Sequence, residues 1–184
     1  KAAQQGSAEA QNNLGVAYQN GTGVNIDIEQ ALYWYELSAS QNYPMAMRNL
    51  GSIYLTILDQ PIKAIEYYQK AFELGTFAAA WDLGVIYLKG REGVKVNEEL
   101  AFEWMLKAAK SFYMPAEFEV SIMYLDGTGV PADELESNFW LMKAFNNNIS
   151  SHDISWNDLV REELARRYYY GIGVEKSFKK AKEI

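Results

Sequence analysis

Small and apolar residues recur along this chain in one fixed frame. An Ala or Val is followed four residues later by a Leu or Val, and four residues after that by a Tyr. The sets are Ala10, Leu14, Tyr18; Ala46, Leu50, Tyr54; Ala79, Leu83, Tyr87; Ala116, Val120, Tyr124; and Val160, Leu164, Tyr168. A spacing of four places such residues on one stripe of an amphipathic helix. The pattern therefore predicts five copies of a first helix, at separations of 36, 33, 37 and 44 residues.

A second amphipathic segment follows each of these stripes. It carries a small residue, an aromatic residue three positions later and another small residue at position seven. The small residues are Ala31, Ala64, Ala101, Ser137 and Ala181, the aromatics Trp34, Tyr67, Trp104 and Trp140, and the later small residues Ser38, Ala71, Ala108 and Ala144. Small and large residues that alternate on one face allow two helices to interlock. Each unit is therefore predicted to be a pair of helices.

Glycines and polar residues punctuate the two helices. Gly21, Gly90, Gly127 and Gly171 stand three residues after a Tyr, where a left-handed residue would end the first helix. Asp27, Asn97, Asp133 and Ser177 come four residues after the next Gly and suit the N-cap of the second helix. Gln30 and Glu136 would complete two capping boxes. The second unit lacks this loop and places Pro61 in the first turn of its second helix.

This frame predicts a single repeat domain over residues 1–184. Its repeats cover 7–42, 43–75, 76–112, 113–146 and 157–184, with 1–6 as the end of a preceding repeat. The link 147–156 is an insertion that interrupts the frame. Both termini fall inside a repeat, whereas the ends of a complete array are usually capped by polar faces. We therefore expect a fragment of a longer array, cut at both ends.

The frame A-x-x-x-L-G-x-x-Y-x-x-G-x-G-V, followed by D-x-x-x-A-x-x-W, resembles the Sel-one-like repeat (SLR) family, which is related to the tetratricopeptide repeats. The resemblance implies an all-α fold, a right-handed α/α solenoid of antiparallel helix pairs whose first helices line a concave groove. It also implies a scaffold or adaptor that binds other proteins, with no common catalytic activity. The resemblance also favours a bacterial protein that is located in the periplasm, the cell envelope or the cytoplasm.

By this analogy the groove is lined by the residues two before, two after and five after the Leu of each first helix. They are Asn12, Val16, Gln19; Arg48, Ser52, Leu55; Trp81, Val85, Leu88; Phe118, Ile122, Leu125; and Glu162, Arg166, Tyr169. Asn20, Lys89 and Asp126 would add to a polar rim. A central apolar patch with a polar rim is typical of a protein-binding surface. Trp81 and Phe118 are either exposed in this groove or covered by neighbouring first helices.

Charge and composition narrow the function further. The chain has a net charge of -7 and a pI of about 4.8, with no basic cluster that would attract nucleic acid. No apolar run is long enough to predict membrane insertion. With no cysteine and one histidine, His152, a metal site is not expected. Ser151, His152 and Asp153 are adjacent in sequence, so we do not expect them to converge as a catalytic triad.

The sequence thus predicts a binding protein without catalysis or cofactor. Its partner would be another protein or a peptide, and we expect the chain itself to be a monomer. Three alternatives stay open. The chain could be an inhibitor or immunity-type protein that binds a toxin or enzyme through the 147–156 insertion, the repeat region of a larger enzyme or signalling protein, or a self-assembling structural protein.

Overall fold

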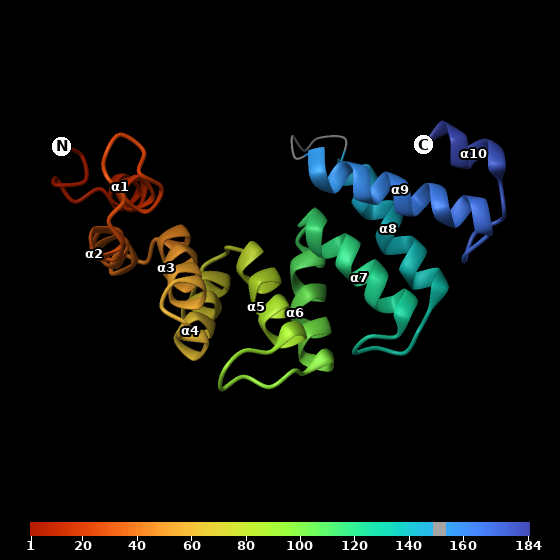
Figure 1. The fold of residues 1–184 in the computed structure, drawn as a ribbon, viewed down its shortest axis with the longest axis horizontal. Coiled ribbons are helices and arrows are strands. Elements are labelled where there is room, and N and C mark those ends of the chain that lie inside the picture. The colour runs from red at the N-terminus through yellow and green to blue at the C-terminus, as the bar shows by residue number, and fades with distance from the viewer. Residues whose placement is uncertain (149–153) are drawn as a thin grey trace. The chain divides into compact units, whose positions relative to one another are not determined.

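The computed structural model describes residues 1–148 and 154–184, and within them it is helical and contains no β-strand. The helices run in chain order (Figure 1). They are α1 (Ala8–Asn20), α2 (Ile28–Ala39), α3 (Pro44–Thr56), α4 (Pro61–Glu73), α5 (Ala78–Lys89), α6 (Glu98–Lys110), α7 (Met114–Asp126), α8 (Glu134–Asn148), α9 (Ile154–Tyr170) and α10 (Phe178–Glu183). Odd-numbered helices are the predicted first helices and even-numbered helices the predicted second helices, so the expected all-α repeat fold is confirmed.

The chain divides into two compact units. Unit 1 comprises Lys1–Ile86 and Gly90–Lys95, and unit 2 comprises Tyr87–Lys89 and Val96–Ile184. Unit 1 thus holds α1 to α4 and most of α5, whereas unit 2 holds the last turn of α5 and α6 to α10. Within unit 1, α1 packs on α2 and α3 on α4, and α2 contacts α3. Within unit 2, α7 packs on α8 and α9 on α10, and contacts also join α6 to α7 and α8 to α9.

The second helices begin where polar residues predicted them. The carboxyl of Asp27 accepts from the backbone N–H of Gln30 at 2.9 Å, and Asn97, Asp133 and Ser177 accept in the same way from the residue three positions on. The prediction of capping boxes with Gln30 and Glu136 is wrong for the second hydrogen bond of each box, from the N-cap N–H to the Gln or Glu side chain. The N–H of each N-cap residue instead donates to the carbonyl of the Tyr that ends the core stripe of the first helix, as from Asp27 to Tyr18 at 3.0 Å.

This backbone bond recurs wherever the glycine loop occurs. The N–H of the N-cap residue donates to the carbonyl of the Tyr at 2.8–3.0 Å. The pairs, donor first, are Asp27 and Tyr18, Asn97 and Tyr87, Asp133 and Tyr124, and Ser177 and Tyr168. It satisfies a carbonyl at the end of the first helix and fixes the start of the second, so one hydrogen bond closes the loop. The second repeat has no glycine loop, yet Gln60 donates to Tyr54 at 2.7 Å in the same role, with Pro61 at the helix start as predicted.

The first glycine of each loop ends its helix with a positive φ. Gly21 and Gly127 are left-handed, with φ of 72° and 76°, and donate to the carbonyl four residues earlier. The expectation of the same geometry at Gly90 is wrong, because its φ of 67° is combined with a ψ of 166°. This loop has one extra residue, and Arg91 and Val94 exchange backbone hydrogen bonds of 2.9 and 2.8 Å across it.

Glycine is needed at the second position of the loop in the fourth and fifth repeats for a different reason, namely a close contact with the preceding repeat. Gly129 lies against the backbone at the start of α6, where an added Cβ would overlap the carbonyl oxygen of Glu98. A Cβ on Gly173 would lie 2.8 Å from the carbonyl oxygen of Glu134 at the start of α8. Gly23 has nothing within 4 Å of such a Cβ. In the fourth and fifth repeats the loop therefore docks on the second helix of the repeat before it, and only glycine permits the approach. A Cβ at Gly93 would meet only the Ile62 side chain, at an ordinary 3.6 Å.

The predicted Ala, Leu and Val positions are buried in the first helices of the second to fourth repeats. Ala10 and Leu14 in the first repeat, and every Tyr of the stripe except Tyr54, are only half-buried. Leu50, Leu83 and Val120 have no exposed surface, and the small residues of the second helices, Ala31, Ala64, Ala101 and Ser137, also have none. The pattern did not predict the large residue that fills the second-helix core. This is the residue after each repeated aromatic, namely Tyr35, Tyr68, Met105 and Leu141, all at most 3% exposed.

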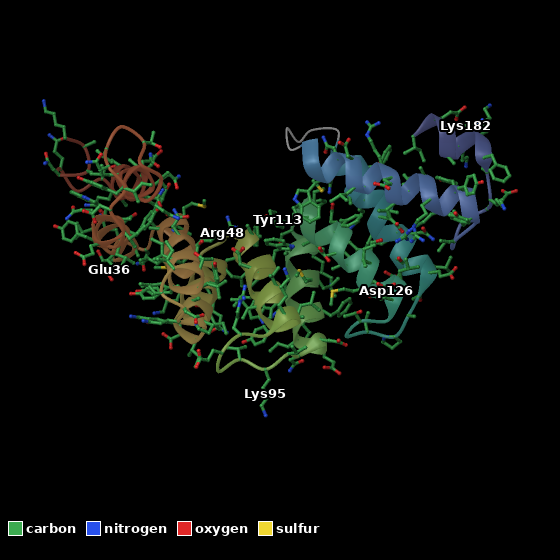
Figure 2. The ribbon with its side chains drawn as sticks, in the orientation of Figure 1. Glu36, Arg48, Lys95, Tyr113, Asp126 and Lys182 are labelled. Carbon is green, nitrogen blue, oxygen red and sulfur yellow. The ribbon has the colours of Figure 1, made fainter. Side chains whose placement is uncertain are left out.

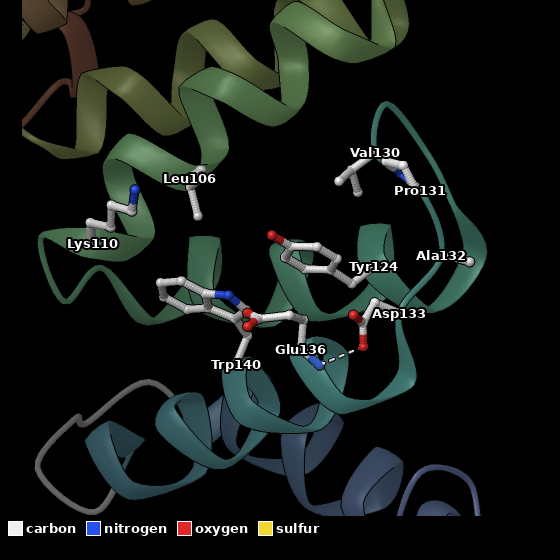
Figure 3. A pocket seen from close by; sticks show the side chains of 9 residues that line it. All are labelled: Leu106, Lys110, Tyr124, Val130, Pro131, Ala132, Asp133, Glu136 and Trp140. Carbon is white, nitrogen blue, oxygen red and sulfur yellow. Dashed lines mark hydrogen bonds between the residues drawn. The ribbon is translucent and has the colours of Figure 1, made fainter.

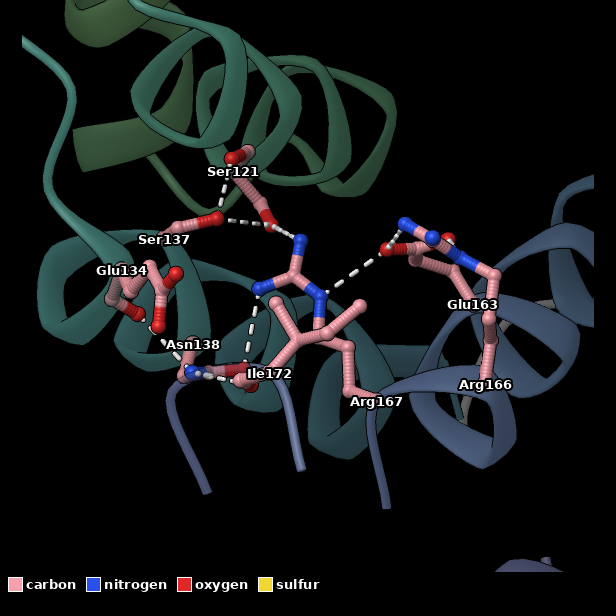
Figure 4. A network of polar contacts seen from close by, with 8 residues as sticks. All are labelled: Ser121, Glu134, Ser137, Asn138, Glu163, Arg166, Arg167 and Ile172. Atoms are coloured by element: carbon pink, nitrogen blue, oxygen red, sulfur yellow. Dashed lines mark hydrogen bonds and ion pairs between the residues drawn. The ribbon is translucent and has the colours of Figure 1, made fainter. Parts of the chain in front are cut away.

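A buried arginine replaces the apolar core residue in α9, the first helix of the last repeat (Figure 4). Arg167 stands at the register position of Ile53 and Met123 and is fully buried. Its guanidinium donates to Glu163 Oε1, Asn138 Oδ1 and Ser121 Oγ, each at 2.9 Å. Because these partners come from α9, α8 and α7, the polar network ties three helices of unit 2 together.

Candidate partner-binding surfaces

Polar side chains join successive first helices in unit 1. Asn49 Nδ2 of α3 donates to Asn12 Oδ1 of α1 at 2.9 Å. Arg48 of α3 (Figure 2) pairs with Asp82 of α5, its Nε lying 2.5 Å from Oδ2. Burial raises the pKa of the Asp82 carboxyl, and the Arg48 guanidinium offsets part of that rise. Arg48 therefore links two repeats, while its side chain is 28% exposed.

The predicted groove residues of unit 1 differ in exposure. Asn12 is buried, in keeping with its amide contact, whereas Asn20 at the end of α1 is exposed. Leu55 of α3 and Trp81 and Val85 of α5 are half-buried. Apolar surface thus remains accessible on α3 and α5 around the Arg48–Asp82 pair, which itself supplies one charge of each sign.

In unit 2 the predicted residues gather on α7 and α9 and on the last turn of α5. Phe118 is half-buried because its ring meets Trp156 of α9 edge-on, at 5.9 Å between centroids, and packs on the core of Met114, Leu141 and Leu164. Ile122 and Leu125 are also half-buried. Of the two readings left open for Phe118, packing between neighbouring first helices accounts for much of its surface.

The charged residues expected at the rim of unit 2 lie at the surface. Lys89, Asp126 (Figure 2) and Arg166 are exposed. Arg166 makes a bidentate pair with Glu163, with Nε to Oε2 at 2.7 Å and Nη2 to Oε1 at 2.8 Å. Lys89 lowers the pKa of the Glu119 carboxyl, but burial raises it by more, so the net shift is upward.

One position of the repeat places an apolar side chain in contact with solvent in the second to fifth repeats. It is the position five residues after the Leu of each first helix, occupied by Leu55, Leu88, Leu125 and Tyr169. The three leucines are half-buried and Tyr169 is 49% exposed. Each lies one turn or less from a buried core residue on the same helix, so these side chains extend the core toward the surface.

Sequence reasoning missed two features of the surfaces. Asp82 was not predicted as the partner of Arg48, although a register of 34 residues between them is close to the repeat length. Sequence reasoning also missed a pocket on the second helices of unit 2, which is lined in part by Lys110, Glu136 and Trp140. No periodic signal points to this pocket, because its walls come from three helices and a loop.

Residues 149–153 of the 147–156 insertion, which include His152, lie outside the described residues. The remaining positions of the insertion belong to the end of α8 and the start of α9. Within residues 1–148 and 154–184, acidic and histidine side chains form no cluster of three that could hold a metal ion. In the same part of the chain, every helix is too short or too polar to cross a bilayer.

Comparison with known proteins gives the same frame independently. The family model described as "Sel1 repeat" matches residues 8–43, 44–76, 77–111, 115–148 and 162–183. A putative Sel1-like repeat-containing protein of Acanthamoeba polyphaga mimivirus is 34% identical over 124 residues, which is 67% of this chain. The chain spans only 22% of the length of that relative.

Two solved structures share the fold over 99% of this chain. A Sel1 repeat protein from Oxalobacter formigenes has a TM-score of 0.79 and 29% identity, and this chain covers 70% of it. A protective antigen of uropathogenic Escherichia coli strains, which displays an SLR fold, has a TM-score of 0.83 and 30% identity, with 38% of it covered. Because the family model matches all five helix pairs in register, the chain belongs to the Sel1 repeat family.

Proposed function

We propose that this chain is a non-catalytic scaffold that holds a protein or peptide segment against its first helices. Sel1 repeats generally mediate protein–protein interactions, and the family is of the scaffold or adaptor type. The observation that carries the proposal is the half-exposed apolar position of Leu55, Leu88, Leu125 and Tyr169. Apolar side chains that remain accessible at a repeated position and lie beside charged residues are suited to a partner's side chains.

Charge at the edge of this surface supports recognition of the partner more than affinity for it. In unit 2 each apolar residue of this surface has a charged residue on its own helix. The pairs are Leu88 and Lys89 on α5, Leu125 and Asp126 on α7, and Tyr169 and Arg166 on α9, and the charges have both signs. Exposed charges at a rim steer association and exclude partners of the wrong charge pattern, and they add little affinity. The apolar residues would therefore supply the binding energy, and the rim would select the partner.

The test removes apolar surface at the proposed site and leaves the fully buried core residues unchanged. Leu88→Ser/Leu125→Ser changes two half-buried positions of unit 2, and the matched control Val96→Ser/Leu135→Ser removes two side chains that are 55% and 75% exposed elsewhere in the same unit. Both variants and the wild type are immobilised, checked by circular dichroism, and exposed to extract of the organism that encodes the protein. The proposal expects one or more proteins retained by the wild type and the control but lost by the Leu88/Leu125 variant.

Two outcomes would contradict the first-helix surface. If the same proteins stay bound to both variants, the site lies elsewhere, and deletion of residues 147–155 then tests the insertion. If the control loses them and the Leu88/Leu125 variant does not, the surface around Val96 or Leu135 carries the binding. Phe118 is left unchanged in this design because its packing on Trp156 would confuse loss of binding with loss of folding.

A further inference from the structure

Unit 2 contains a pocket that shares no residue with the proposed first-helix surface. It encloses about 470 Å³ between α6, the end of α7, the following loop and α8 (Figure 3). The lining residues are Leu106, Lys110, Tyr124, Val130, Pro131, Ala132, Asp133, Glu136 and Trp140. A volume of this size suits one large side chain together with its main-chain neighbours.

A buried hydrogen-bond donor lines this pocket. Trp140 is 5% exposed, and its Nε1 is buried without a hydrogen-bond partner in the described part of the chain. Figure 3 shows the indole nitrogen on the edge of the ring turned toward Glu136 and Tyr124. A buried N–H that lacks an acceptor is destabilising, so a ligand that brings an acceptor to this edge gains a hydrogen bond that the protein alone does not make.

Two carboxyl groups lie on this side of the pocket, and Lys143 Nζ lies over the Trp140 ring, 4.6 Å from its centroid. The Asp133 carboxyl caps α8 by accepting from the N–H groups of Leu135 and Glu136 at 2.9 and 3.1 Å, and the exposed Glu136 carboxyl belongs to no ion pair among the described residues. Burial raises the pKa of the Tyr124 phenol, and the carboxylates of Glu136 and Asp133 raise it further. Two carboxylates near the Tyr124 ring favour a cation at that ring, whereas the Trp140 ring already has the Lys143 cation over it.

The pair of carboxylates distinguishes the fourth repeat from the others. Trp34 is the counterpart of Trp140 in the first repeat, and its Nε1 is likewise buried without a partner in the described residues. The counterpart of Glu136 is Gln30 there and Leu100 in the third repeat. The indole donor therefore belongs to the repeat, whereas the second carboxylate is specific to this pocket.

We propose that this pocket binds one lysine or arginine residue of a basic polypeptide segment. The cationic group lies beside Glu136 and the Tyr124 ring, and the carbonyl of the same residue accepts from Trp140 Nε1. The net charge of -7 favours approach of a basic partner. Lys110 on the α6 side of the pocket repels a second cation, so the pocket suits a single basic residue better than a run of them.

Two short peptides of equal length test the proposal by nuclear magnetic resonance. The probes are acetyl-Gly-Lys-Gly-amide and acetyl-Gly-norleucine-Gly-amide, which differ only in the charged end of one side chain. They are titrated to millimolar concentration into the ¹⁵N-labelled chain, and the indole resonance of Trp140 is assigned from the spectrum of Trp140→Phe. The lysine peptide is expected to shift the Trp140 indole resonance at a concentration at least about threefold lower than the norleucine peptide.

Matched charge variants then separate a local contact from the total charge. Glu136→Gln is expected to weaken binding of the lysine peptide by about threefold or more, whereas Glu103→Gln, an exposed change of the same charge on α6, leaves it unchanged. Equal responses to the two peptides, an unmoved Trp140 resonance, or equal effects of the two variants would each overturn the proposal. A response to free lysine with none to the lysine peptide would overturn the assignment to a polypeptide.

Discussion

Gly15 of α1 lies against the ring of Tyr35 of α2, and a Cβ at Gly15 would come within 2.7 Å of two ring carbons. Tyr35 is fully buried and its hydroxyl donates to Gln19 Oε1 at 2.7 Å, so the ring has no room to move away. Gly51 and Tyr68 form the same pair in the second repeat. The fourth repeat has Ser121 and Leu141 at these two positions, so a larger first-helix residue accompanies a smaller partner.

Gly15→Ala is therefore expected to destabilise the chain although Ala is the better helix former. Overpacking against Tyr35 costs about 1–3 kcal/mol and exceeds the helix gain of at most about 1 kcal/mol. Urea unfolding followed by circular dichroism measures the change. Gly15→Ala/Tyr35→Leu, which approximates the Ser121 and Leu141 pair, should recover part of the loss that each single change produces. Additive losses in the double variant would show that the two residues are not coupled.

Gly129→Ala is expected to destabilise unit 2 more than Gly127→Ala in the same loop. Both glycines have positive φ, 68° and 76°, so both substitutions strain the backbone by a similar amount. A Cβ at Gly127 meets Ala132 at an ordinary 3.5 Å, whereas one at Gly129 overlaps the backbone of Glu98. The extra loss should be about 1 kcal/mol or more by denaturant unfolding. Equal losses would mean that the loop does not dock on α6 in solution.

Glu163→Gln is expected to lower stability by about 3 kcal/mol at neutral pH, because it leaves the buried Arg167 guanidinium without its counter-ion. Arg166→Gln is the control, since the Arg166 side chain is 44% exposed and its pair with the same carboxyl should contribute about 1 kcal/mol or less. Thermal melts of both variants against the wild type measure the difference. Similar losses for both would contradict a special role for the buried partner.

The same ion pair predicts loss of stability in acid. Burial acts to raise the pKa of Glu163, but the hydrogen bonds from Arg166 and Arg167 outweigh it and hold the pKa below the ordinary value. The stabilisation is therefore present above the unfolded pKa, about 4.3, and is lost as pH falls through the lower folded value. The difference in the free energy of unfolding between the wild type and Glu163→Gln should shrink as pH falls across that interval. An advantage independent of pH would exclude this ionisation as its source.

Glu117→Gln is expected to act in the opposite direction. The Glu117 side chain of α7 is fully buried, and burial raises its pKa although Asn147 Nδ2 donates to both carboxyl oxygens at 2.7 Å. A raised folded pKa means that the ionised carboxylate opposes folding above that pKa and is relieved as pH falls through it. Glu117→Gln should thus be at least as stable as the wild type near pH 7, with any gain disappearing in acid. A clear loss at pH 7 would show that the carboxylate itself stabilises the fold.

The sequence by itself determined the elements and their repeat. Asp27, Asn97, Asp133 and Ser177 cap helices as predicted, and Gly21 and Gly127 end helices as predicted, because caps and left-handed turns depend on groups within a few residues. The spacing of four from Ala46 to Tyr54 likewise fixed the core stripe of α3. These rules are local, so they are legible without knowledge of the neighbours.

The tertiary structure decided which side chains of each stripe meet another helix. Tyr35, next to the repeated aromatic Trp34, fills the core because the interhelical register selects among adjacent positions that periodicity alone leaves equivalent. Arg167 is buried because Glu163, Asn138 and Ser121 converge on it from three helices, and Phe118 is half-covered by Trp156 of α9. The contacts of Arg167 with Asn138 and Ser121 join residues 29 and 46 positions apart. The sequence does not show them, because the burial of a residue is decided by the neighbours that pack on it and not by the residue itself.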